Sequence, residues 1–219
     1  MNLLRSNWFD LGLLLAVPAS LYVGIQYSQF SELQVLLWIS LISLWLHQFE
    51  EYRYPGYFPG VVNKVLFRSE LPDRYPLNAN TSLVVNVYIG WSLYLLAALL
   101  AEQAIWLAMA SILVSLGNVM AHTFLFNIRG RTVYNPGLAT ALLFFLPVSL
   151  GFFCLIHDQH LVTPLDYVIG IPFGIVLNYV GILKMIDWLK DERTPFPFPK
   201  RSMLPSERPR YAANPRRKR

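Results

Sequence analysis

Residues 33–52 read LQVLLWISLISLWLHQFEEY, and this stretch decides the fold. Its first fourteen residues are almost entirely apolar, whereas its last six contain His47, Glu50 and Glu51. An α-helix rises 1.5 Å per residue, so a helix of roughly 20 apolar residues crosses the hydrocarbon core of a bilayer. The stretch therefore predicts a membrane-spanning helix that carries ionisable groups close to one end.

The rest of the chain has the same apolar character. Of its 219 residues, 55% are hydrophobic and only 14% are charged, which excludes an ordinary soluble domain. The apolar runs are too long for the alternating strands of a membrane barrel, so helices must do the spanning. Suitable runs occur at 8–27, 33–52, 83–101, 104–128, 138–156 and 164–186. We predict an all-α, polytopic membrane protein, a six-helix transmembrane bundle.

Basic residues occur only on alternate connections of these six spans. Positions 27–32, 102–103 and 157–163 contain no Lys or Arg, and all eighteen basic residues lie before the first span, in the other connections, or from Lys184, at the end of the sixth span, onward. The positive-inside rule then predicts a multi-pass protein of the cell (inner) membrane with both termini in the cytoplasm. Because topology accounts for the positive charge, we expect no nucleic-acid partner. A signal peptide cleaved after Ala19 is an alternative for the first span and leaves the later topology unchanged.

Composition divides the chain into a membrane domain, residues 1–187, and a basic tail, residues 188–219. The loop 53–82 within the first part contains an apolar segment with Lys64 and Arg68, which predicts a short interfacial helix on the cytoplasmic leaflet. The tail mixes prolines with Arg and Lys and is expected to be disordered. It either contacts anionic membrane lipids or serves only as a topology anchor.

Two spans carry matching polar stripes. His47, Glu50 and Glu51 project from one face of the second span, since residues three and four apart lie on the same side of a helix. Asn118 and His122 continue a stripe of serines on the fourth span, at the same depth. Ionisable groups are costly within a membrane and therefore mark candidate sites.

Three interpretations of these groups stay open. His47 and His122 could bind Zn²⁺ or Fe²⁺ together with Glu50 or Glu51, leaving positions for water or substrate, while the other glutamate acts as a base; of the two we name Glu51 as the ligand. A buried glutamate paired with His122 could instead transfer protons without a metal. In a purely structural alternative, the carboxylates pair with nearby arginines and the histidines hydrogen-bond serines across helices.

The motif at the end of the second span resembles that of the HXXEE domain family of multi-pass membrane proteins. His47, Glu50 and Glu51 are the matching positions, and Pro55, Gly56 and Asn63 follow in the loop. The resemblance covers most of the membrane region but not the basic tail. It implies an enzyme on the strength of the motif, without a general assigned reaction.

The sequence thus favours a membrane-embedded enzyme acting on a lipid-like or isoprenoid-like substrate, a lipophilic small molecule. We expect His47, Glu50, Glu51 and His122 to carry out metal-assisted or acid/base chemistry. Further residues are expected to bind the substrate: Asn86 and Asn118 would orient these groups, and Arg129 or Arg131 would hold an anionic group. The alternatives are a proton-coupled transporter or channel and a membrane scaffold without catalysis.

Overall fold

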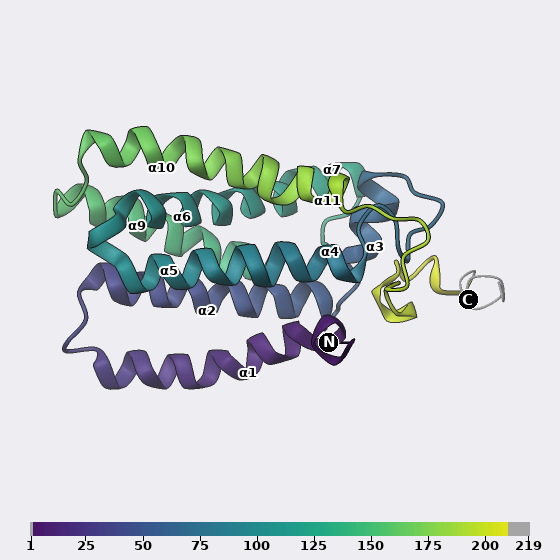
Figure 1. The fold of residues 1–219 in the computed structure, drawn as a ribbon, viewed down its shortest axis with the longest axis horizontal. Helices are drawn as coiled ribbons and strands as arrows, with labels where there is room; N and C mark the ends of the chain where they lie inside the picture. Colours follow the sequence, from purple (N-terminus) through teal and green to yellow (C-terminus); the bar gives the residue numbers. More distant parts are fainter. Residues whose placement is uncertain (1, 210–219) are drawn as a thin grey trace.

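The computed structural model describes residues 2–209, and within this range the chain is all helical, with no β-strand. Long helices lie side by side along one axis and form a bundle (Figure 1). The first two are α1, Asn2–Gln26, and α2, Glu32–Tyr52. Four further rods each consist of an α-helix, a π-helical segment and a second α-helix. The label η marks π-helical segments in these rods and 3₁₀ segments at η3 and η7. The third rod comprises α4 (Ala79–Leu83), η2 (Val84–Trp91) and α5 (Ser92–Leu100), and the fourth comprises α6 (Ile105–Met120), η4 (Ala121–Leu125) and α7 (Phe126–Gly130). The fifth comprises α8 (Leu138–Thr140), η5 (Ala141–Phe145) and α9 (Leu146–Asp158), and the sixth comprises α10 (Pro164–Val176), η6 (Leu177–Lys184) and α11 (Met185–Trp188).

The described residues include five helices that are long and apolar enough to cross a membrane. The third of these, Ala79–Gly130, reverses direction at a short 3₁₀ segment, η3 (Ala101–Ala104), where Ala101 has a φ of +36°. Because of this reversal, α5 and α6 pack side by side, and the described part of the bundle contains six rods (Figure 1). The prediction of an all-helical, multi-pass membrane bundle is confirmed.

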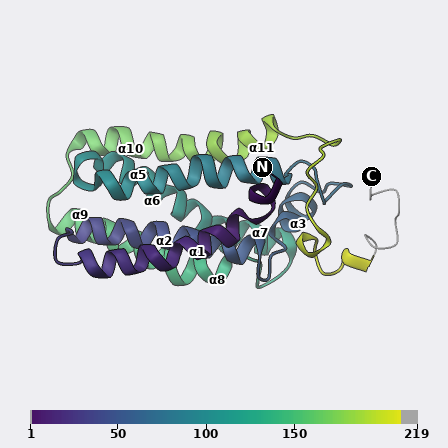
Figure 2. The same cartoon turned by 60° about the horizontal axis from the view of Figure 1, so that its bottom comes forward.

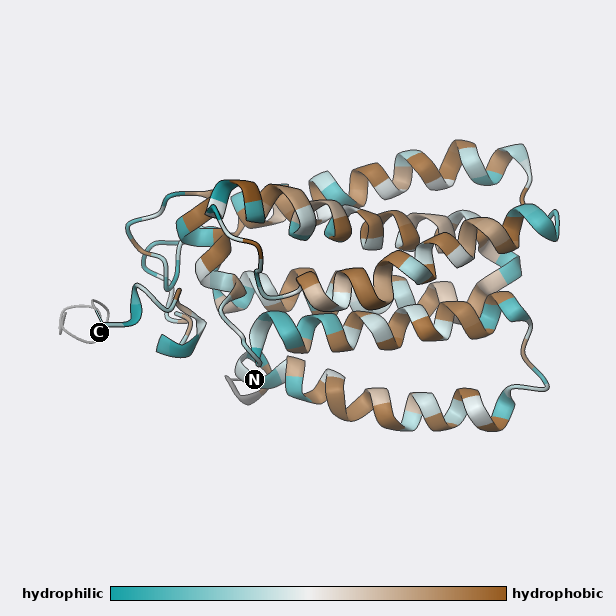
Figure 3. Cartoon of the chain, turned by 180° about the vertical axis from the view of Figure 1, so that it is seen from behind, coloured by the Kyte–Doolittle hydropathy of each residue, from teal (hydrophilic) through white to brown (hydrophobic). Residues whose placement is uncertain are grey.

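The outside of the bundle is apolar along its length, as expected of a surface in contact with lipid. Leu14, Ile25 and Val168 expose 68%, 78% and 67% of their surface, and Figure 3 shows this apolar colouring along the rods. Inside, the buried small residues Ala98 and Ala108 let α5 and α6 approach closely. Small side chains at helix contacts are typical of membrane bundles, where van der Waals packing replaces the hydrophobic effect between helices.

One end of the bundle, which we call the basic end, is covered by the start of α1, the loop 53–78 and the chain after Trp188 (Figure 2). The loop contains the short helix α3, Phe58–Gly60, and η1, Val61–Leu66. The sequence predicts this helix on the membrane surface, but Val61 and Val62 are buried against the bundle. The Asn63 side chain fixes the loop, because its amide donates to the Pro72 carbonyl at 2.9 Å and accepts from the Leu77 amide at 2.9 Å.

The chain after Trp188 packs on the basic end as far as the structure describes it. Phe198 and Met203 are buried, and the Phe198 amide donates to the Asp73 carbonyl at 2.6 Å. A 3₁₀ turn, η7 (Lys200–Ser202), lies between them. The structure therefore differs from the disorder predicted for the tail over 189–209, because two apolar side chains among the prolines find a buried site. Residues 210–219 lie outside the described residues.

Candidate metal centre

Three ionisable side chains meet inside the bundle near its basic end. His47 and Glu51 lie one turn apart on α2, and His122 lies in η4 of a neighbouring rod. The exposed fractions of these three residues are 2%, 4% and 0%. One carboxylate oxygen, Glu51 Oε1, lies 3.6 Å from His47 Nε2 and 3.3 Å from His122 Nε2. The centroids of the two imidazole rings are 4.9 Å apart, so the structure brings together groups from both polar stripes.

The other nitrogen of His122 is held by Asn135, in the loop after α7. His122 Nδ1 lies 2.6 Å from Asn135 Oδ1. The orientation of the Asn135 amide is fixed, since its nitrogen donates to the His122 carbonyl and to Asn127 Oδ1, both at 2.8 Å. An amide oxygen only accepts hydrogen bonds, so Nδ1 of His122 carries the proton.

The other nitrogen of His47 is held by Thr140, at the end of α8. His47 Nδ1 lies 2.9 Å from Thr140 Oγ1, which donates to Glu50 Oε2 at 2.6 Å. Because the hydroxyl proton of Thr140 is directed to this carboxylate, the hydroxyl oxygen accepts from His47. The hydrogen-bond network therefore assigns the proton of His47 to Nδ1 as well.

Glu50 does not belong to the group of three ionisable side chains, and its carboxylate is saturated with donors. Besides the Thr140 hydroxyl, it accepts from the Thr140 amide at 2.8 Å, the Ala139 amide at 3.3 Å and the Tyr134 hydroxyl at 2.8 Å. Burial, and next the hydrogen bond to Glu50, raise the pKa of the Tyr134 phenol, so Tyr134 stays a neutral donor. Glu50 thus fixes Thr140 in α8, and Thr140 in turn holds His47, while the Glu51 carboxylate faces the imidazoles.

The two Nε2 atoms therefore present lone pairs toward Glu51. Both are buried, and neither has a hydrogen-bond partner in the described structure. Two lone pairs and a carboxylate oxygen repel one another unless a cation or an additional proton lies among them. Donor atoms about 2.0–2.1 Å from a tetrahedral ion lie roughly 3.3–3.4 Å from one another, which is close to the observed 3.3 and 3.6 Å.

The loop before α8 requires glycine at the position that touches His122. Gly137 has a φ of +103°, and a Cβ added there would lie 2.3 Å from His122 Cε1. Glycine meets both demands because it has no side chain and tolerates positive φ. The turn ahead of Thr140 thus packs directly on the imidazole. Fixing the ring orientation in this way is what the surroundings of a metal-bound histidine do.

A cavity of about 620 Å³ extends from His47 and Glu51 between η2, α6 and η6. Its wall is mostly apolar, with polar side chains from four rods: Gln48, Asn86, Asn118 and Asn178. None of the described residues that line it is Lys or Arg. Ile175 and Tyr179 belong to the wall and are 61% and 55% exposed on the outside of the bundle, so the cavity reaches the lipid-facing surface.

The residues predicted to bind substrate lie in two different places. Asn86 and Asn118 line the cavity, where Asn86 accepts from Gln48 at 3.1 Å and Asn118 lies close to His47. Arg129 lies in α7 and Arg131 directly follows it; both are exposed, and neither lines the cavity. Arg129 donates to the Leu66 carbonyl at 3.4 Å. The structure therefore does not bring these two arginines to the site, because α7 carries them beyond His122.

Sequence reasoning missed the residues that hold the histidines in place, Asn135 and Thr140. Both follow Arg129 and Arg131, for which the sequence predicted a role in binding an anionic group. The available signal was an Asn-Pro-Gly turn followed by Thr in the first turn of a helix, since such residues cap helices and fix turns. Their reach back to His122 and His47 depends on long-range packing that this local signal does not contain.

Comparisons with known proteins place this site within a described family. Residues 38–152, just over half of the chain, match the family described as a protein of unknown function with HXXEE motif. The matched range contains both histidines, both glutamates, Asn135 and Thr140. Searches of curated proteins and of solved structures gave no match.

Proposed function

The chain belongs to the HXXEE family, and we propose that it is a membrane-embedded enzyme that uses a divalent cation, zinc or ferrous iron. His47, Glu51 and His122 would bind the ion. The main support is the convergence of two buried imidazole lone pairs on one carboxylate oxygen, with both Nδ1 protons directed elsewhere. Imidazole and carboxylate ligands suit both ions.

Three protein ligands leave coordination positions open for water or substrate, as in catalytic rather than structural sites. A bound ion would polarise a substrate oxygen or lower the pKa of a bound water. The chain itself supplies orientation, because Thr140 and Asn135 hold the two rings and Glu50 holds Thr140. We no longer assign Glu50 the role of a base, since four donors already occupy its oxygens.

The substrate we propose is a lipid or another lipophilic small molecule. The cavity beside the site has a mostly apolar wall that includes residues exposed on the lipid-facing surface. An apolar chain entering from the membrane would place its polar, reacting group beside Asn86, Asn118 and the metal ligands. The described wall offers no Lys or Arg, which favours an uncharged reacting group such as an ester, amide or alcohol.

We further propose that the protein lies in the cell membrane with its basic end in the cytoplasm. The support is the distribution of Lys and Arg, all of which fall in segments that meet at that end or in the terminal residues. The site would then lie about one to two helical turns below the cytoplasmic surface.

A transporter is the competing function, and the core beyond the site argues against it. A proton or ion path through a membrane is marked by ionisable side chains that continue across it. Toward the opposite end, the polar groups buried in the described core are hydroxyls, such as those of Ser40, Ser111 and Tyr94, and none is Asp, Glu, His, Lys or Arg. This packing favours a pocket that is open on one side only.

The test is metal analysis of the detergent-purified, full-length protein beside Glu51→Gln and His122→Ala variants. We expect about one zinc or iron ion per chain in the wild type and loss of the ion in both variants. His157→Ala, an exposed histidine in the last turn of α9, and Glu192→Gln, an exposed carboxylate, are matched controls that should keep the ion. Wild-type protein without a retained or rebound ion would contradict the metal site and leave proton transfer between Glu51 and His122.

A further inference from the structure

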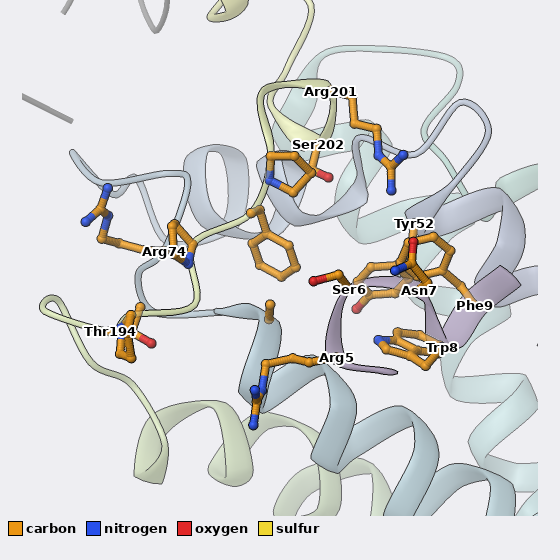
Figure 4. A pocket seen from close by; sticks show the side chains of 15 residues that line it. Arg5, Ser6, Asn7, Trp8, Phe9, Tyr52, Arg74, Thr194, Arg201 and Ser202 are labelled. Atoms are coloured by element: carbon orange, nitrogen blue, oxygen red, sulfur yellow. The ribbon is translucent and has the colours of Figure 1, made fainter. Parts of the chain in front are cut away.

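A second cavity lies at the basic end, apart from the metal centre (Figure 4). Its volume is about 790 Å³, and its walls come from the start of α1, the loop before α4 and the chain 194–202. Three arginines line it, Arg5, Arg74 and Arg201, and none of its described lining residues is Asp or Glu. The charged side chains of its described lining are therefore all positive, and they come from three segments that are distant in sequence.

Arg201 directs its charge into this cavity. In Figure 4 its guanidinium points toward Tyr52 and Asn7, and its Cζ lies 5.6 Å from the centroid of the Phe9 ring. Within the described residues its side-chain contact is this aromatic ring, with no hydrogen bond or ion pair. Burial and the nearby charge of Arg53 lower the pKa of Arg201 by more than the charge of Asp10 raises it, so the positive charge of Arg201 is not fully compensated. An anion in the cavity would relieve both effects.

The guanidinium groups of Arg5 and Arg74 lie at the rim of the cavity. Arg5 Nε donates to Asn80 Oδ1 at 3.2 Å, and Arg74 pairs with the buried Asp73 at 2.6 Å. Figure 4 shows both guanidinium groups turned away from the centre of the cavity. The charge of Arg74 is therefore compensated by Asp73 and Arg5 adds positive charge at the rim, whereas Arg201 is the group placed for direct contact.

We propose that this cavity binds a phosphate group, with Arg201 as the direct ligand. Arginine matches phosphate because its planar fork donates two parallel hydrogen bonds to adjacent oxygens. The hydroxyls of Ser6 and Ser202 add donors, and the rings of Trp8 and Phe9 provide an apolar wall for the remainder of the ligand. The phosphate is either the head group of an anionic phospholipid or part of a soluble molecule. This proposal is independent of the metal centre.

The experiment uses full-length protein in detergent and two probes, phosphatidic acid followed by native mass spectrometry and inorganic phosphate followed by calorimetry. Phosphatidylcholine is the neutral lipid control. Arg201→Gln should weaken binding about tenfold or more, because it removes a charge-assisted hydrogen bond. Lys200→Gln is the control: it removes one positive charge from the residue directly before Arg201, and that residue does not line the cavity. It should change binding by no more than about twofold.

Ser6→Asp provides a second variant that removes no packing. Ser6 is exposed and lines the cavity, so a carboxylate there should repel phosphate, whereas Ser206→Asp outside the cavity should not. Sensitivity of phosphatidic acid alone to Arg201→Gln and Ser6→Asp supports the lipid source, and the same sensitivity of inorganic phosphate supports a soluble ligand. Failure of both probes to bind, or equal effects of each variant and its control, would overturn the proposal.

Discussion

Replacing Thr140 by valine tests the role assigned to the residues that orient the metal ligands. The substitution removes one hydroxyl and leaves the side-chain volume almost unchanged. In the wild type this hydroxyl accepts from His47 Nδ1 at 2.9 Å and donates to Glu50 Oε2 at 2.6 Å. Without it, a ring N–H that is almost completely buried loses its acceptor, and the carboxylate loses one of its four donors.

The expected loss follows from these contacts. Removing the hydrogen-bond partner of a metal-bound histidine usually lowers metal affinity about 10- to 100-fold. This range corresponds to roughly 1.4–2.8 kcal/mol of binding free energy. A buried donor without a partner costs about 1–3 kcal/mol of stability, so the unfolding temperature of the metal-free protein should also fall.

Thr123→Val is the matched control for this substitution. Thr123 lies next to His122, and its hydroxyl is buried without a hydrogen-bond partner. Its removal should leave metal affinity unchanged and leave the unfolding temperature unchanged or slightly higher. The assay is a zinc titration of detergent-purified protein against a chromophoric chelator, with thermal unfolding in parallel. Equal affinities for the wild type and Thr140→Val, or an equal loss in Thr123→Val, would refute the proposed orientation of His47.

Three further predictions address the loop and the cavity. Gly137→Ala should abolish metal retention and lower the unfolding temperature, measured by metal analysis and calorimetry, because a Cβ there would lie 2.3 Å from His122. Tyr134→Phe should lower the free energy of unfolding by about 1 kcal/mol, because the hydrogen bond from the phenol to Glu50 is lost. Because the phenol pKa is raised in the folded state, this difference should stay constant between pH 6 and pH 9 and shrink above its ordinary pKa of 10.0, as unfolding titrations at several pH values would reveal. Gly90→Leu should fill the cavity and block binding of a fluorescent fatty-acyl probe while metal content stays unchanged, since Gly90 lines the cavity and a Cβ there would make only ordinary van der Waals contacts, at 3.4 Å or more.

The sequence was sufficient to predict the rods and to predict that the two histidines lie at the same level of the bundle. Long apolar runs dictate membrane helices because a bilayer offers no partner for backbone polar groups. The HQFEE end of α2 and the Asn118 and His122 stripe of α6 and η4 follow from helical periodicity, and the two histidines indeed lie together. Helical periodicity could not predict which glutamate faces the histidines, since Glu50 and Glu51 are consecutive residues of the same helix.

The parts that sequence reasoning missed depend on how loops return to the bundle. Arg131 ends α7 with a φ of +49°, and the turn that follows brings Asn135 and Thr140 back to the histidines. Arg129 lies exposed on the outside of the bundle, whereas the sequence predicted that Arg129 or Arg131 would bind an anionic group at the site. At the basic end, Phe198 and Met203 anchor a segment whose proline and arginine content predicts disorder.

X-ray absorption at the metal edge of the purified, ion-loaded protein measures the central claim directly. The account predicts one ion per chain with two imidazole nitrogens and a carboxylate oxygen at about 2.0–2.2 Å, and loss of one imidazole contribution in His122→Ala. An ion bound through sulfur, or a spectrum in which the imidazole contribution is the same in His122→Ala as in the wild type, would contradict it.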